Sequence, residues 1–226
     1  FHYIKSLADF NFGAIYDPEI NSNYYLLIPY GSIIFHSIVF KLIGNLSFVL
    51  LEFLAIFLFI TIFYLIFRLI NFSKNLSILL PVIFYTLPDF LHFFNYFNII
   101  EIGSFSGNFY SLRFPRPLVS NLFFFAFIYI LIQSHIKKNL FTKKNLFSLS
   151  IIFGMTLSSF FFLFLTIAIT FILYLLIYFK KNIFQIINLN LKKIIYSLIL
   201  FILIILPFIF LLYFTNPDYS ERMGII

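Results

Sequence analysis

Two short stretches hold residues whose types and spacing suit chemistry. In the first, LPDFLH, Asp89 follows Pro88 and His92 comes three residues later. Residues three apart share one face of a helix, so a carboxylate and an imidazole there could bind a polar substrate or share a proton. The alternative is that both side chains lie at the membrane interface and are simply hydrated.

The second stretch, RFPRP, places Arg113 and Arg116 beside Pro115 and Pro117. Proline fixes its own backbone and restricts the residue before it. Guanidinium groups held in this way suit bidentate binding of a phosphate. Diffuse attraction to anionic lipid headgroups is the alternative, but it needs no such stiffening, so we favour a specific phosphate site.

A polar segment, residues 95–116, connects the two stretches and contains Glu101. It is rich in Asn, Ser and Gly, as are both active-site loops and ordinary loops. No Walker A, GxSxG or HExxH motif is present, there is no Cys, and the four His are not paired at helical spacing. These absences argue against P-loop ATPases, serine hydrolases, zinc peptidases and His-based or thiolate metal sites.

The elements that carry these residues must lie in a membrane. Of the 226 residues, 62% are hydrophobic and only 10% are charged, and the mean hydropathy is +1.05. A soluble domain carries about 25% charged residues. The composition therefore predicts an all-α fold, a polytopic transmembrane helical bundle.

Four stretches are long and apolar enough to be single spans of about 20 residues. They are Leu46–Ile70, Leu76–Phe94, Leu118–Ile136 and Ile194–Phe214. A fifth stretch, Asn145–Phe179, would extend about 50 Å as one helix, against a hydrocarbon core of about 30 Å. Lysine pairs flank it on both sides, so we favour a hairpin that turns near Ser158–Phe160 over one tilted helix.

The positive charges then give one topology, since cytoplasmic loops carry an excess of Lys and Arg. Ten of the fifteen cations fall in three loops on one side, which we expect to be cytoplasmic: Arg68, Lys74, Lys137, Lys138, Lys143, Lys144, Lys180, Lys181, Lys192 and Lys193. None of the eight acids falls in those loops. Glu52 lies about two turns into its span, and we expect either a buried carboxyl that links two helices or a catalytic group.

The N-terminal part contains a less clear helix, Tyr24–Ile43, which includes Pro29, Gly31, His36 and Lys41. We favour a helix that lies in the outer interface over a full span, because a span would place three acids in the cytoplasm. The expected organisation is an external loop and interfacial helix over 1–45, a bundle of about six helices over 46–214, and the start of an external loop over 215–226. We also expect a fragment that lacks at least one N-terminal span.

The order of these features resembles the GT-C superfamily of multi-span membrane glycosyltransferases. The resemblance is carried by IKSLADFNFGAIYDPE, by YYLLIPYGSIIFHSIVFKLIG, by spans that end in YLIFRLI and LPDFLHFFN, and by RFPRP. It covers nearly the whole chain as a pattern and rests on no single diagnostic motif. The first catalytic acid of the family would fall before Phe1, so this sequence does not contain it.

The resemblance implies transfer of a sugar from a polyprenyl-phosphate donor to an acceptor on the outer face of a bacterial inner membrane. Asp89, with Glu101 as its rival, would be the catalytic or acceptor-orienting acid, and Arg113, Arg116 and His92 would bind the substrate. The expected partners are membrane lipids and the lipid-linked sugar, with no nucleic acid; a divalent metal is left open. A transporter or flippase and a non-catalytic assembly subunit are the alternatives.

Overall fold

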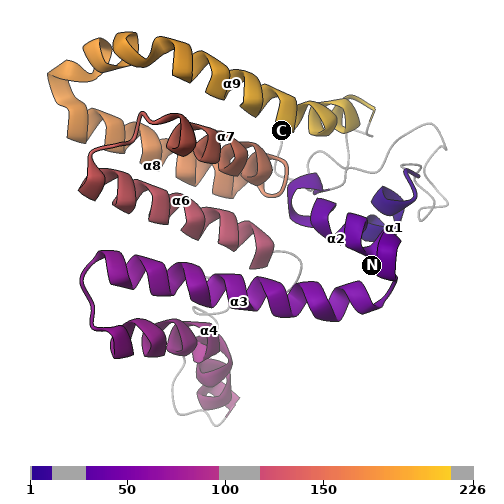
Figure 1. Cartoon of the computed structure of the whole chain (residues 1–226). Helices are drawn as coiled ribbons and strands as arrows, with labels where there is room; N and C mark the ends of the chain where they lie inside the picture. The colour runs from indigo at the N-terminus through magenta and orange to yellow at the C-terminus, as the bar shows by residue number, and fades with distance from the viewer. Residues whose placement is uncertain (1, 12–28, 97–117, 215–226) are drawn as a thin grey trace.

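The computed structural model of the chain describes residues 2–11, 29–96 and 118–214, and every regular element in them is helical. The elements are α1 (His2–Ala8), α2 (Tyr30–Ile43), α3 (Leu46–Leu69), α4 (Lys74–Tyr96), α6 (Leu118–Lys137), α7 (Lys143–Leu157), α8 (Phe161–Phe179), the 3-10 turn η1 (Lys180–Asn182) and α9 (Ile183–Tyr213). This confirms the predicted all-α class (Figure 1).

Four of these helices, α3, α6, α8 and α9, are long and apolar enough to cross a membrane. The predicted spans Leu46–Ile70 and Leu118–Ile136 are confirmed to within one residue, since α3 ends at Leu69 and α6 at Lys137. The predicted span Leu76–Phe94 lies inside α4. The chain is therefore a polytopic helical membrane protein.

The predicted hairpin is confirmed as two helices, α7 and α8, which break at Ser158–Phe160. Ser158 Oγ donates to Gly154 O at 2.9 Å and Ser159 Oγ donates to Met155 O at 2.6 Å. Such hydroxyl bonds to the preceding turn compete with helix continuation. The backbone of Phe160 is extended (φ −156°), so the helix is interrupted there and α8 begins at the next residue.

α9 begins at Ile183, whereas the sequence predicted the span to begin at Ile194. Its 31 residues extend about 46 Å. The sequence placed Lys192 and Lys193 in a loop, but both lie on α9. Lys193 Nζ donates to Phe141 O at 3.3 Å and to Asn190 Oδ1 at 2.7 Å. The first turns of α9 are thus held against the preceding α6–α7 turn.

α2 is shorter than the predicted helix Tyr24–Ile43, since it begins at Tyr30, directly after Pro29. Gly44 ends it with a positive φ of 59°, and its N–H donates to Phe40 O at 2.7 Å. Fourteen residues reach about 21 Å, too short to cross a bilayer alone. This length is in keeping with a helix that lies at the interface; residues 24–28 fall outside the described part of the chain.

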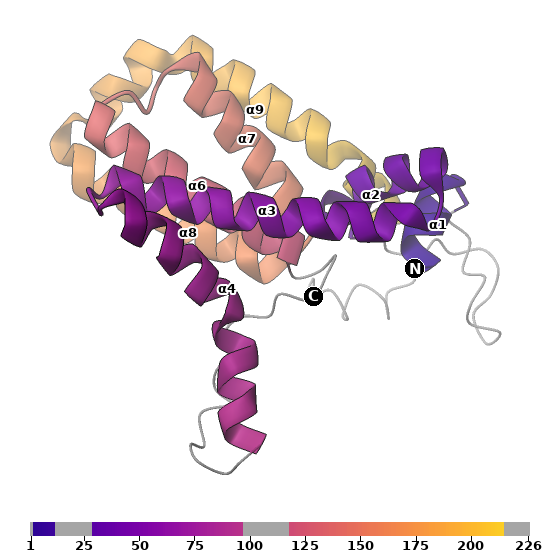
Figure 2. The ribbon, with the colours of Figure 1, turned by 60° about the horizontal axis from the view of Figure 1, so that its bottom comes forward.

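The bundle is built around α7, which contacts α2, α6, α8 and α9, while α3 packs between α4 and α6. Phe127 and Ile167 are fully buried in the contact of α6, α7 and α8, and Phe59 is fully buried between α3 and α6. Viewed from another side, α3 lies across the bundle with α7 and α9 behind it (Figure 2). Of the four helices that are long and apolar enough to cross a membrane, α8 is the least buried, with Ile167 as its only buried residue.

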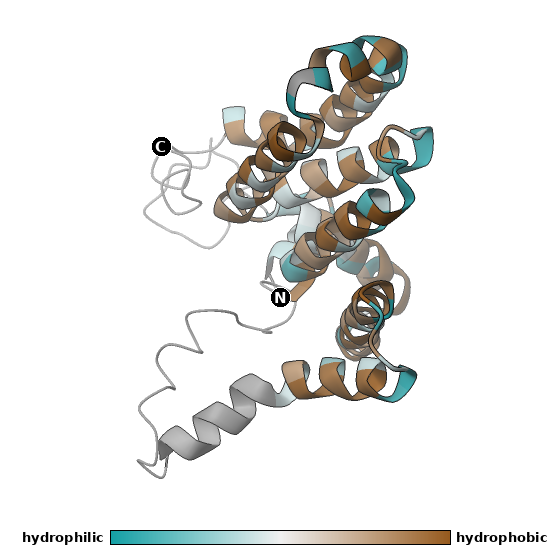
Figure 3. Ribbon diagram, turned by 90° about the vertical axis from the view of Figure 1, so that its left-hand side faces the viewer, coloured by the Kyte–Doolittle hydropathy of each residue, from teal (hydrophilic) through white to brown (hydrophobic). Residues whose placement is uncertain are grey.

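The turns α3–α4, α6–α7 and α8–α9 lie at one end of the bundle, which we call the lysine end (Figure 1). Hydrophilic residues gather at these turns, and hydrophobic residues cover the helices between them (Figure 3). α2 and the α7–α8 turn lie at the opposite end, called the α2 end. The cations that the sequence assigned to three separate loops thus meet at the lysine end.

The structure contradicts the interpretation of Glu52 as a buried carboxyl that links two helices. It lies on an exposed face of α3, beside the exposed side chains of Val49 and Phe53. An early position on the helix, six residues after Leu46, places it about 9 Å from the helix start. At that depth the long side chain can reach the interface, which explains why no neighbouring helix is needed to cover it.

Candidate functional site

The residues that the sequence singled out lie at the edge of, or beyond, the described structure. Asp89 and His92 belong to the last part of α4, whose backbone is helical but whose side chains fall outside the description. Glu101, Arg113 and Arg116 lie outside the described residues altogether. The described part of the chain therefore does not test whether these five residues lie together, and their roles stay predictions.

The described residues form a candidate site in a groove between α2, α3 and α6 at the α2 end. It encloses about 500 Å³, within the usual range for small-molecule sites. Leu51, Leu54 and Leu58 of α3 form one wall, and Val119 and Leu122 of α6 begin the other. Its lining is almost entirely apolar, so the groove suits a hydrocarbon chain. We call it the α2–α3–α6 groove.

Two polar residues of α2, Ser32 and His36, line this groove. They lie four residues apart, so they share one face of the helix. Ser32 Oγ donates to Pro29 O at 2.9 Å, which fixes the first turn of α2. The His36 ring lies edge-on to Phe48 with 4.2 Å between ring centroids. The polar end of the groove is therefore built on α2.

Burial sets the ionisation state of His36. The side chain is only 2% exposed, and this desolvation lowers the pKa of His36 from 6.5 to about 4. The imidazole is therefore neutral at physiological pH. A neutral imidazole can donate one hydrogen bond and accept another, so it can orient a polar group without attracting an anion by charge.

α2 is held in place by a close approach to the α7–α8 turn. The Gly31 N–H donates to Ser158 O at 3.3 Å. A Cβ at position 31 would collide with Met155 O and lie 2.5 Å from Ser159 Oγ, so only glycine fits there. Ser37 Oγ donates to Ile33 O at 3.0 Å and keeps a second hydroxyl on the buried face of the helix.

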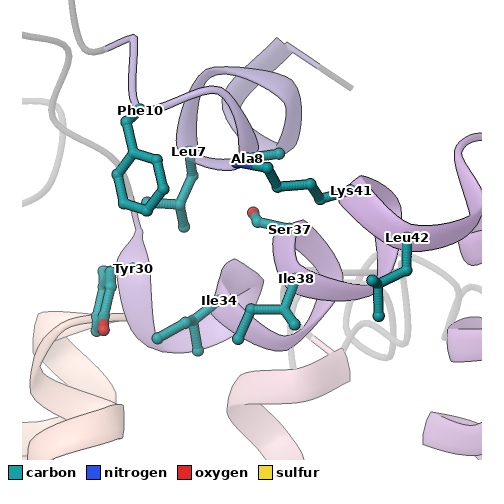
Figure 4. A pocket seen from close by; sticks show the side chains of 9 residues that line it. All are labelled: Leu7, Ala8, Phe10, Tyr30, Ile34, Ser37, Ile38, Lys41 and Leu42. Atoms are coloured by element: carbon teal, nitrogen blue, oxygen red, sulfur yellow. The ribbon is translucent and has the colours of Figure 1, made fainter.

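A second hollow of about 320 Å³ lies between α1 and α2 (Figure 4). Phe10 and Tyr30 line one part of it, and Lys41 reaches over it from the last turn of α2. The Lys41 ammonium lies 5.2 Å from the centroid of the Phe10 ring, a cation–π contact. This places a positive charge close to the α2 end, on the far side of α2 from the groove.

Ser32 and His36 were not among the predicted site residues. The sequence signal was present, since Gly31, Ser32, His36 and Ser37 are small or polar positions in a helix with otherwise apolar residues. What the sequence lacked was the packing partner of that face. Among the described residues there is no group of three or more His, Cys, Asp or Glu that could hold a metal ion.

Comparison of the chain with protein-family models, with curated proteins and with solved structures finds no match. The function is therefore inferred from the residues and the geometry of the α2 end.

Proposed function

We propose that this protein is a GT-C-type membrane glycosyltransferase, which moves a sugar from a polyprenyl-phosphate donor to an acceptor on the outer face of a bacterial inner membrane. The α2–α3–α6 groove is the observation that carries the proposal. It is apolar, lies toward the α2 end of the bundle, opposite the lysine end, and is large enough for part of an isoprenoid chain.

The position of the groove also suits a lipid phosphate. Its α6 wall starts at Val119, and the RFPRP stretch directly precedes Leu118, the first residue of α6. A lipid whose tail follows the groove would thus carry its headgroup toward the part of the chain that holds Arg116. Two guanidinium groups can bind such a phosphate with paired hydrogen bonds.

The proposed reaction has one bond formed and one broken at the anomeric carbon. The acceptor oxygen or nitrogen attacks that carbon, and the bond from carbon to the phosphate oxygen breaks. Asp89 or Glu101 takes the acceptor proton, and Arg113 and Arg116 stabilise the negative charge on the departing lipid phosphate. The products are the glycosylated acceptor and a polyprenyl phosphate.

A groove-filling substitution tests the proposal in the full-length protein. Leu54→Trp fills the groove, whereas Leu50→Trp, one turn away on α3, adds the same bulk to an exposed position outside it. We expect Leu54→Trp to raise the KM for a long-chain polyprenyl-phosphate sugar several-fold and to leave the KM for a short-chain donor unchanged. Equal KM values for the parent and both variants would exclude the groove as the donor site.

Assays of the purified parent protein distinguish the function classes. For a transferase we expect sugar transfer by the parent, and weaker donor binding and slower transfer by Arg116→Ala. If the parent protein moves a lipid-linked sugar across vesicle bilayers without transferring it, the protein is a flippase. If the parent neither transfers nor moves the donor, the assembly-subunit alternative holds and the proposal is wrong.

A further inference from the structure

A second groove lies between α8 and α9. It encloses about 390 Å³. Its floor is α7, with Leu149 and Phe153, and its walls carry Phe171 and Leu175 from α8 and Phe201 from α9. It exists because α8 packs on α7 and α6 but makes little contact with α9. We call it the α8–α9 groove.

The length of this groove matches one leaflet of a bilayer. Its α8 wall runs from Phe164 to Leu175, which is about 16 Å along the helix. Half of the hydrocarbon core is about 15 Å. The two hydroxyls in the lining, Ser150 and Ser197, are satisfied because Ser150 donates to Ser197 O at 2.7 Å and Ser197 donates to Leu146 O at 3.0 Å. The hydroxyls of the lining therefore have hydrogen-bond partners within the protein, and an acyl chain can pack against them without leaving a polar group unsatisfied.

A fixed cation marks the lysine end of the groove. Phe141 lines the groove there, and its carbonyl accepts a hydrogen bond from Lys193 Nζ at 3.3 Å. The same ammonium donates to Asn190 Oδ1 at 2.7 Å. A lysine ammonium has three donors, so its hydrogen bonds within the described residues leave a third for an anion at the groove entrance.

The surrounding charge has one sign. Residues 118–214 contain no Asp or Glu and have eight lysines, namely Lys137, Lys138, Lys143, Lys144, Lys180, Lys181, Lys192 and Lys193. Lys143, Lys144 and Lys180 are exposed at the turns of the lysine end. No acid of this helical unit neutralises them, so the groove entrance is suited to a negatively charged headgroup.

We infer that the α8–α9 groove binds an anionic phospholipid from the leaflet at the lysine end, with one acyl chain between α8 and α9 and the phosphate on Lys193 and the exposed lysines beside it. The apolar groove of leaflet depth supplies the chain site, and the fixed ammonium at its entrance supplies the headgroup site. This inference is independent of the proposed transferase activity, since it concerns the opposite end and a different groove.

Quenching by brominated lipids tests the inference in the full-length protein reconstituted into bilayers. This sequence contains no Trp, so once any Trp elsewhere in the full-length protein has been replaced by Phe, a single reporter can be introduced as Phe171→Trp in the groove. A matched reporter, Ile177→Trp, lies on the same helix at a position that is 69% exposed and outside the groove. Each is titrated with brominated phosphatidylglycerol and, separately, with brominated phosphatidylcholine.

We expect the groove reporter to be quenched at a severalfold lower fraction of phosphatidylglycerol than of phosphatidylcholine, and the exposed reporter to respond equally to both. Lys193→Gln should weaken the preference about fivefold, the effect of one lysine near a lipid surface. Lys137→Gln should leave it unchanged, because Lys137 is an exposed lysine on α6, a helix that contributes no residue to the groove lining. If Lys193→Gln does not fold, Lys180→Gln at an exposed position serves instead and should also reduce the preference.

Equal quenching of the groove reporter by the two lipids would overturn the inference. So would a phosphatidylglycerol preference of the same size at both reporters, because that result indicates only diffuse attraction to the lysine end. A preference that Lys137→Gln reduces as much as Lys193→Gln would refute the assigned headgroup site.

Discussion

Replacement of Gly31 by alanine should displace α2 from the α7–α8 turn. An added Cβ would collide with Met155 O and lie 2.5 Å from Ser159 Oγ and 2.6 Å from Ser158 Oγ. A serine side chain can rotate away, but Met155 O is a backbone atom in the last turn of α7 and cannot. The helix must therefore move outward, and the bond from Gly31 N to Ser158 O, already 3.3 Å long, should break.

Two terms set the size of the effect. Overpacking of a closely packed site costs about 1–3 kcal/mol, and loss of a backbone hydrogen bond adds about 1 kcal/mol. We expect Gly31→Ala to lower the free energy of unfolding by about 2–4 kcal/mol. For a chain of this size 1 kcal/mol corresponds to roughly 2–4 °C, so the midpoint of thermal unfolding should fall by about 4–16 °C.

The assay is thermal unfolding of the full-length protein in detergent, followed by circular dichroism. Leu42→Ala is the matched control, because Leu42 lies on the same helix and is 77% exposed. A second readout uses one introduced cysteine, since this sequence has none and any cysteine elsewhere in the full-length protein is first replaced by serine. Ser32→Cys places a thiol at a position that is 4% exposed, and maleimide should label it only when Gly31→Ala is also present.

A Gly31→Ala protein with an unchanged midpoint and a protected thiol at position 32 would refute this reasoning. It would mean that α2 does not lie against the α7–α8 turn as described. A lower midpoint without increased labelling would show that the strain is relieved elsewhere, and the predicted outward movement of α2 would be wrong.

Three further predictions concern the packing, the pH response and the topology. Ser150→Ala and Ser197→Ala should each destabilise by about 0.6 kcal/mol, the mean for hydrogen bonds between membrane helices, and the double variant by less than the sum, since both hydroxyls belong to one network; fully additive losses in thermal unfolding would contradict this. Burial lowers the pKa of His36 to about 4, so the unfolded chain binds the extra proton below pH 6.5 and stability is lost as the pH falls from 6.5 toward 4. The loss should reach up to about 3 kcal/mol, and His36→Phe should flatten this part of the pH profile of the unfolding midpoint, whereas an identical profile would exclude His36 as its source. Cysteines introduced by Lys144→Cys and Asn45→Cys, both at exposed positions, should be labelled by an impermeant maleimide from opposite sides of the membrane; labelling of both from one side would contradict the predicted topology.

The residues of the α2–α3–α6 groove were not predicted from the sequence. Asp89, His92, Glu101, Arg113 and Arg116 were predicted instead, because ionisable residues are scarce in such a chain and can be recognised without knowledge of their packing partners. The groove of α2, α3 and α6 could not be predicted, because its walls come from segments separated by up to about ninety residues. His36 was not predicted as a site residue, because a single histidine forms no motif with a recognisable spacing.

The sequence by itself determined the membrane class, the positions of the spans α3 and α6, and the break between α7 and α8. These are local properties: apolar length decides whether a segment can span, and a Ser-rich turn between lysine pairs decides where it reverses. Only the tertiary structure decided that α9 begins eleven residues before its predicted start, that Glu52 lies on an exposed face, and that one groove forms between α2, α3 and α6 and another between α8 and α9. These depend on which helices touch and how closely, and a hydropathy pattern contains no information about contacts between distant segments.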